Sequence, residues 1–406
     1  MPPTPDETIA AVLQALPDAL AFDDGTPVRT PADWRRRRGE LLATFTREMY
    51  GRMPAALPWT PFETIESSDA AVGGRARRRQ VALHLGDAPD AARAELLIYL
   101  PPGRGPVPLL LGLNTWGNQT VIADPAVRIT ERQVFARMKD GITRDGGVIT
   151  ARATEKSRGY DAVHWPIERI LARGVGVATI YRGEFDADKP EHPEWGVRAS
   201  HPDLLDGGDN FSTIGAWAWG LSRAMDYLIQ DADVDAKRIG VWGWSRLGKA
   251  AVWAGATDER FGLVISAESG SGGAKVFHHD VGENVKRLTE MFPHWFCRNF
   301  RNYVGHETTM PFDQHEVLSL IAPRPLYVSG SAGALPFDAI GEYLGPRAAD
   351  RVYRFLGTDG LPDGTYPAEG ETRHGRIGYH RHAGGHDVTA FDWEQFLTFC
   401  ERHWKA

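Results

Sequence analysis

One short segment of the 406-residue chain has the features of a serine nucleophile turn. An apolar strand predicted over residues 238–242 runs into Gly243, Ser245 follows, and a helix is predicted over 247–255. Such a turn holds the serine hydroxyl above a sheet edge and points the next backbone N–H at a developing oxyanion. The strict Gly-x-Ser-x-Gly pattern is not met, because the second glycine is Gly248 and Leu247 precedes it. A serine that only caps the following helix is the alternative interpretation.

Two cations follow the serine closely. Arg246 and Lys249 lie at the start of the predicted helix, where the helix macrodipole disfavours positive charge. Cations beside a nucleophile suggest a transition state that develops negative charge, and a substrate that is anionic or rich in hydroxyls. Ordinary surface charges are the alternative.

A serine hydroxyl needs an imidazole to take its proton and an acid to orient that imidazole. In the fold that this turn belongs to, the chain order is Ser, acid, His. His386 lies in a late glycine-bearing stretch, 383–388, before a predicted closing helix, and is the expected base. His380 and His382 are weaker candidates for the base. The alternative interpretation is that either is a histidine on the surface. The expected acid is Glu268, which directly follows the segment 264–267 at the end of a strand predicted over 262–266 and lies 268 − 245 = 23 residues after the nucleophile.

The rest of the pattern provides a sheet to hold these groups. Short apolar or alternating runs predict strands, and runs with helical spacing predict helices between the later ones. The expected strands are 80–85, 94–100, 107–113, 176–181, 238–242, 262–266, 324–329 and, last, 352–356; the expected helices include 213–230, 247–255 and 392–403. This order predicts an α/β fold with a mostly parallel central sheet covered by helices on both faces. We expect one domain, 1–406, with a helical start over 1–60 and insertions near 115–165 and 183–210 over the active-site face.

Composition excludes several classes of partner. The net charge is −7 with both signs mixed, whereas phosphate binding needs a concentrated basic face, so we expect no nucleic acid. The basic run 35–38 shares its stretch with Glu40 and Glu48 and is interpreted as a solvated helix face. No apolar run reaches the roughly 18 residues that a membrane helix needs, so we expect no membrane partner. The acidic N-terminus shows no signal-peptide pattern.

Cysteine and aromatic residues are interpreted as structural. Cys297 and Cys400 form either one bridge or two buried thiols, and we expect thiols. No Cys/His spacing typical of zinc is present, and we expect neither a metal nor an organic cofactor. Four tryptophans on predicted buried elements are expected in the core: Trp217, Trp219, Trp242 and Trp253. Three others are expected nearer the site: Trp116, Trp244 and Trp295. Any of them could contact a sugar, and the sequence does not rank them.

Several longer motifs carry a specific resemblance. They are Gly-x-Ser-Arg-x-Gly-Lys at 243–249, Trp-Phe-Cys-x-Asn-Phe-x-x-Tyr at 295–303, Phe-Asp-Gln-His-Glu at 312–316, Ile-Ala-Pro-Arg-Pro at 321–325, and Gly-His-Asp-Val at 385–388. Together, over roughly 30–400, they resemble the glucuronoyl esterases, carbohydrate esterase family 15. The resemblance implies the α/β-hydrolase fold and cleavage of esters between lignin alcohols and the 4-O-methyl-glucuronic acid of xylan. A secreted or periplasmic location is also implied, and we favour a monomer.

The resemblance also implies roles for single residues. Ser245, Glu268 and His386 match the family's catalytic triad, and Arg246 matches a residue that helps to form the oxyanion hole. Lys249 matches a residue that contacts uronate hydroxyls, and Glu283 falls about where bacterial members place another sugar-binding acid.

One departure from the family bears on the substrate. The family usually has a sugar-stacking Trp after the strand predicted at 324–329, but residues 329–335 contain no aromatic residue. An esterase acting on another uronate or on a small acyl ester is therefore the alternative. A non-catalytic carbohydrate-binding protein on the same fold is a third hypothesis, against which the complete Ser/Glu/His set speaks.

Overall fold

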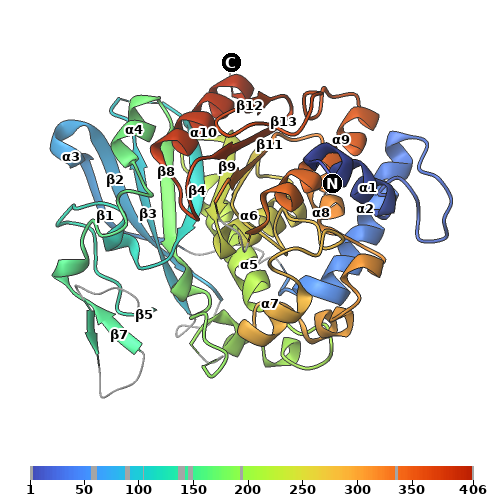
Figure 1. Cartoon of the computed structure of the whole chain (residues 1–406). Helices are drawn as coiled ribbons and strands as arrows, with labels where there is room; N and C mark the ends of the chain where they lie inside the picture. The colour runs from blue at the N-terminus through green and yellow to red at the C-terminus, as the bar shows by residue number, and fades with distance from the viewer. Residues whose placement is uncertain are drawn as a thin grey trace. The chain divides into compact units, whose positions relative to one another are not determined.

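The computed structural model describes residues 3–55, 62–86, 92–103, 105–135, 142–144, 150–192, 195–333 and 337–404. The chain divides into two compact units (Figure 1). The first unit comprises Met1–Arg52, Asp206–Gly215 and Trp242–Ala406, and the second comprises Met53–Leu205 and Ala216–Val241. The chain passes from one unit to the other within α5 (Thr213–Leu228) and within β9 (Val234–Trp244).

The second unit is built on a mixed sheet, in which β1 to β3 run antiparallel, β3 pairs antiparallel with β8, and β8 pairs parallel with β4. Its elements are β1 (Phe62–Ala70), α3 (Ala71–Gly74), β2 (Ala76–His84), β3 (Arg93–Leu100), β4 (Val107–Asn114), α4 (Ile167–Ala172) and β8 (Gly176–Tyr181). Three short strands form a separate sheet inside the predicted insertion at 115–165: β5 (Gln133–Phe135), β6 (Ile142–Arg144) and β7 (Thr150–Ala153).

The first unit carries the remaining strands in the order β10-β11-β13-β12, in which only the β12–β13 pair is antiparallel. Its strands are β10 (Leu263–Ala267), β11 (Leu326–Ser331), β12 (Thr372–His374) and β13 (Ile377–His382). Its helices are α1 (Pro5–Ala15), α2 (Pro31–Phe45), a π-helical turn (Thr46–Tyr50), α6 (Arg246–Thr257), α7 (Val285–Met291), α8 (Gln314–Ser319), α9 (Ala339–Phe355) and α10 (Ala390–His403). Helix α6 packs on β10, and both α9 and α10 pack on β11 and β13 (Figure 1).

The register of the parallel strands brings distant segments to one edge. Ala267 at the end of β10 is aligned with Ser329 of β11, and Ser331 at the end of β11 is aligned with His382 of β13. All residues of β10 and β11 are buried, as apolar strands covered by helices should be. The carboxyl ends of neighbouring parallel strands therefore present their following loops side by side, which is where α/β folds place their sites.

The α/β pattern of the sequence is confirmed, with one wrong strand. The predicted last strand, 352–356, instead belongs to the end of α9, whose buried residues Gly345, Ala349, Val352 and Tyr353 follow helical spacing. A short apolar run cannot by itself distinguish a strand from a buried helix segment. The last strands are β12 and β13. They were not predicted, because their histidines and arginines interrupt the apolar pattern typical of a buried strand.

Other expectations about the core are confirmed. Cys297 and Cys400 are both buried thiols. The four tryptophans expected in the core are buried.

Among the described residues, no helix combines the length and the apolar character that crossing a membrane requires.

Candidate active site

Ser245 occupies a strained turn between β9 and α6. Its backbone has φ 58° and ψ −130°, a region that residues other than glycine rarely adopt. The Ser245 N–H donates to the Ala267 carbonyl at 2.9 Å, which ties the turn to the end of β10. Although Ser245 stands at the N-cap position of α6, its side chain makes no capping hydrogen bond. The capping interpretation therefore does not account for this serine, and the strain suggests a functional constraint.

Two glycines make this turn possible. A Cβ atom at Gly243 would lie 2.1 Å from the Leu247 carbonyl oxygen, so no larger residue fits there. A Cβ atom at Gly248 would lie 2.9 Å from the Cβ of Ser269. The displaced second glycine of the motif thus allows α6 to pass close to the loop that follows β10.

Glu268 directly follows β10 and is completely buried, with φ 40°. Its Oε2 atom contacts His386 Nδ1 at 2.8 Å and accepts a hydrogen bond from the Ser331 hydroxyl at 3.1 Å. Its Oε1 atom accepts the Asp387 N–H at 3.2 Å. The structure therefore brings together the acid and the base expected from the sequence, although 118 positions separate them in the chain.

Two aromatic side chains lie close to the His386 ring. Phe337 stacks on it with a centroid distance of 3.8 Å and an interplanar angle of 15°, and Trp244 lies 5.0 Å away at 36°. Trp244 is the residue before the serine, so the imidazole is next to the nucleophile turn. The sequence analysis missed Phe337, which lies just beyond the stretch searched for a tryptophan; residues 334–336 are outside the described residues. In the sequence, Phe337 could have been found only as an aromatic residue that lies shortly after β11.

The two cations after the serine have different surroundings. The Arg246 guanidinium lies 4.7 Å from the ring centroid of Trp295 and 5.3 Å from that of Phe292, which stack on each other. Lys249 is buried, and its Nζ donates to the Ser269 carbonyl at 2.7 Å and the Ser271 carbonyl at 2.6 Å. Burial lowers the pKa of Lys249. The surface-charge interpretation is therefore wrong for Lys249.

Two buried carboxyl groups extend the site along the loop after β10. Glu283 Oε2 accepts hydrogen bonds from Lys249 Nζ and from the Ser271 N–H, both at 3.2 Å. Glu342, which the sequence analysis missed, accepts the Gly270 N–H at 2.8 Å, and burial raises its pKa well above the ordinary value. A Cβ atom at Gly270 would lie 2.6 Å from Glu283 Oε2 and 2.9 Å from Phe337 Cδ1, so both side chains lie against this glycine.

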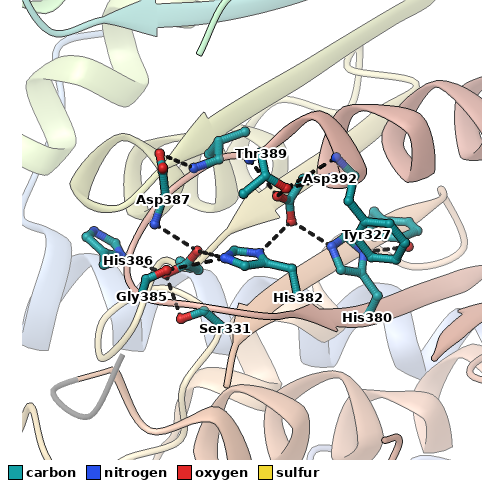
Figure 2. A network of polar contacts seen from close by, with 12 residues as sticks. Tyr327, Ser331, His380, His382, Gly385, His386, Asp387, Thr389 and Asp392 are labelled. Atoms are coloured by element: carbon teal, nitrogen blue, oxygen red, sulfur yellow. Dashed lines mark hydrogen bonds and ion pairs between the residues drawn. The ribbon is translucent and has the colours of Figure 1, made fainter. Parts of the chain in front are cut away.

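His380 and His382 are buried, contrary to the expectation of surface histidines. Both contact Asp392 Oδ1, His380 through Nε2 at 2.7 Å and His382 through Nδ1 at 2.9 Å (Figure 2). On its other side, His382 Nε2 lies 3.4 Å from Glu268 Oε1. A polar network therefore runs from His386 through Glu268 and His382 to Asp392.

Several known proteins that are similar to this chain in sequence and fold are described as esterases. A family model described as glucuronyl esterase of fungi matches residues 159–357. The carbohydrate esterase MZ0003, from an unknown prokaryotic organism, is 42% identical over 393 residues, which are 96% of this chain and 89% of that protein. The solved glucuronoyl esterase from Solibacter usitatus has a TM-score of 0.88 and 41% identity, covering 96% of this chain and 98% of that one. A promiscuous CE15 esterase from a marine bacterial metagenome has a TM-score of 0.87 and 42% identity, covering 96% of each chain.

Proposed function

This chain belongs to the glucuronoyl esterases of carbohydrate esterase family 15 and is a carboxylic ester hydrolase, and from this premise we propose its substrate and its catalytic residues. We propose that it cleaves esters of glucuronic acid or 4-O-methyl-glucuronic acid, such as lignin–carbohydrate esters on glucuronoxylan. Ser245 is the nucleophile, His386 the base and Glu268 the acid that orients the imidazole. The observation that carries this proposal is the 2.8 Å contact between the buried Glu268 carboxylate and His386 Nδ1, beside the strained serine turn.

The reaction is a two-step acyl transfer. Because His386 Nδ1–H donates to Glu268, Nε2 is the basic atom that takes the Ser245 proton as Oγ attacks the ester carbonyl carbon. His386 then returns the proton to the leaving alkoxide as its bond to the acyl carbon breaks. A water molecule, deprotonated in the same way, releases the acid and restores the serine.

Charge develops on the carbonyl oxygen, and Arg246 is proposed to stabilise it. Its backbone N–H is the first of α6 after the nucleophile, and its guanidinium lies over Trp295 and Phe292. One oxyanion donor is typically worth about 3 kcal/mol of transition-state stabilisation. Lys249 and Glu283, which are bound to each other, are proposed to contact the hydroxyls of the uronate.

The nucleophile and the acid can be tested with near-isosteric variants. Ser245→Ala should abolish hydrolysis of benzyl glucuronate and para-nitrophenyl acetate and prevent labelling by a fluorophosphonate. Glu268→Gln should keep the shape of the site but lower kcat by about 10³- to 10⁴-fold, because the amide cannot stabilise the imidazolium. Undiminished turnover by either variant would remove that residue from its role. Fluorophosphonate labelling of the native chain at Ser245 also excludes a protein that only binds carbohydrate.

A broader substrate range is the second candidate. It is favoured by the lack of an aromatic residue at positions 329–335 and by the similarity to the promiscuous CE15 esterase. The kcat/KM values for methyl glucuronate, methyl galacturonate and para-nitrophenyl acetate separate the two candidates. A preference for glucuronate of tenfold or less, by our criterion, would favour the broader esterase.

A further inference from the structure

His382 does not belong to the proposed triad, yet it is the second histidine to contact the triad acid. Its side chain is only 3% exposed, and it is the last residue of β13, aligned with Ser331 of β11. Glu268 therefore lies between two imidazoles, with Oε2 facing His386 and Oε1 facing His382.

The neighbours of His382 determine its protonation. Nδ1 faces the carboxylate of Asp392 at 2.9 Å, and Nε2 faces the carbonyl oxygen of Gly385 at 3.2 Å and Glu268 Oε1 at 3.4 Å. All three partners are hydrogen-bond acceptors, and an imidazole can donate from both nitrogens only as the imidazolium. The contacts therefore require a proton on each ring nitrogen.

Asp392 is held as an anion by its own contacts. Its Oδ2 accepts the N–H and the hydroxyl of Thr389 at 2.7 and 2.6 Å, in the capping box of α10. His380 completes the shell, with Nε2 at 2.7 Å from Oδ1 and Nδ1 at 2.9 Å from the Tyr327 hydroxyl. Burial lowers the pKa of His380, so its imidazole is neutral. It accepts a hydrogen bond from the Tyr327 hydroxyl and donates one to Asp392.

We infer that His382 is a buried positioning residue that is protonated through neutral pH and acts through Glu268, an inference that rests on the proposed role of Glu268 as triad acid. Two buried carboxylates in one network would otherwise disfavour each other's ionisation. With the His382 imidazolium between them, Glu268, Asp392 and His382 carry a net charge of −1. That charge is cancelled when His386 accepts the serine proton, so the network is neutral at the moment of the transition state.

The electrostatics of the network agree with this geometry. Burial acts against the charge on His382, but the hydrogen bond and charge of Asp392, and then the charge of Glu268, raise the pKa of His382 to about 9. The imidazolium therefore persists through neutral pH. The same three side chains, His380, His382 and Asp392, are near enough to hold a cation, but a cation would have to displace the hydrogen bonds described above.

Neutron diffraction from crystals of the native chain near neutral pD tests the protonation without any variant. We expect deuterium on both Nδ1 and Nε2 of His382 and on only one nitrogen of His380. A single deuterium on His382 would overturn the inference while leaving the proposed triad intact.

Kinetics test the positioning role. His382→Gln removes the charge and should lower kcat on benzyl glucuronate about tenfold to hundredfold, as expected for the loss of one hydrogen bond to a charged group, with little change in KM. The alkaline limb of the native kcat profile near pH 9 should move or disappear. The matched control is His403→Gln, in α10, where Nε2 contacts the Gly375 carbonyl at 3.0 Å; this variant should keep native kcat.

The possible failures are distinguishable. Native kcat and an unchanged pH profile in His382→Gln would overturn the inference, even if Ser245→Ala is inactive as the proposed function requires. If Ser245→Ala remains active, the proposed function fails first. If His382→Gln does not fold, the deuterium positions in the native crystal decide the question.

Discussion

At the scale of single residues, the site depends on side chains that steady the imidazole from its faces as well as from its nitrogens. Glu268 holds Nδ1 of His386, and Phe337 covers one face of the ring at a centroid distance of 3.8 Å. An imidazole that accepts and returns one proton must keep its ring in the same orientation throughout the reaction. Phe337 is therefore expected to contribute to turnover although it carries no reacting atom.

Phe337→Ala should lower kcat/KM by about twofold to tenfold, the equivalent of the 0.5–1.5 kcal/mol that an aromatic pair contributes. The measurement is steady-state hydrolysis of benzyl glucuronate. Phe337→Tyr keeps the ring and should stay near the native value. Equal losses in both variants would argue against stacking as the cause.

At the scale of elements, the start of α10 serves both stability and the site. Thr389 caps this helix, and its capping-box partner, Asp392, is the residue that holds His380 and His382. Helix α2 begins with the same arrangement of Thr30 and Asp33, but these two side chains contact none of the site residues described here.

This pair of caps allows a matched comparison. Thr389→Ala and Thr30→Ala should each destabilise the protein by about 1 kcal/mol, as measured by urea denaturation. Only Thr389→Ala should also lower kcat, because it removes a hydrogen bond that orients Asp392. A fall in kcat of the same size in both variants would mean that general destabilisation, rather than the network, limits turnover.

Across the molecule, two histidines, one buried and one half-buried, connect stability to pH in opposite directions. The pKa of His382 is raised to about 9, so its contribution to stability is complete below its unfolded value of about 6.5 and is lost as the pH rises through 9. Burial lowers the pKa of His403 to about 4, so its contribution is present above about pH 6.5 and is lost as the pH falls through 4.

Buried acids titrate in the same pH interval as His403, since burial raises the pKa of Glu316 to about 7. The contribution of His403 is therefore measured as the difference between the native protein and His403→Gln. Between pH 7.5 and 5, the native free energy of unfolding should change in the destabilising direction relative to His403→Gln. Urea denaturation of both proteins at each pH measures this. Parallel pH dependence in the two proteins would contradict the lowered pKa of His403.

Features that depend on local pattern could be predicted from the sequence alone. Gly243, Ser245 and Gly248 predicted the strand–turn–helix unit, and buried strands over 176–181 and 262–266 followed from continuous apolar runs. The family was also recognisable, because its motifs are short contiguous strings. Glu268 and His386 were nominated by chain order and by their places after strands, without any knowledge of the distance between them.

Which side chains share a partner could be seen only in the folded chain. The alignment of β10, β11 and β13 brings Glu268, Ser331 and His382 together, although no local pattern links residues so far apart in the chain. The strands β12 and β13 also escaped prediction, because their histidines are buried by pairing with Asp392 and carry no apolar signal. Burial of polar residues is possible only where distant partners satisfy them, and those partners meet only in the folded chain.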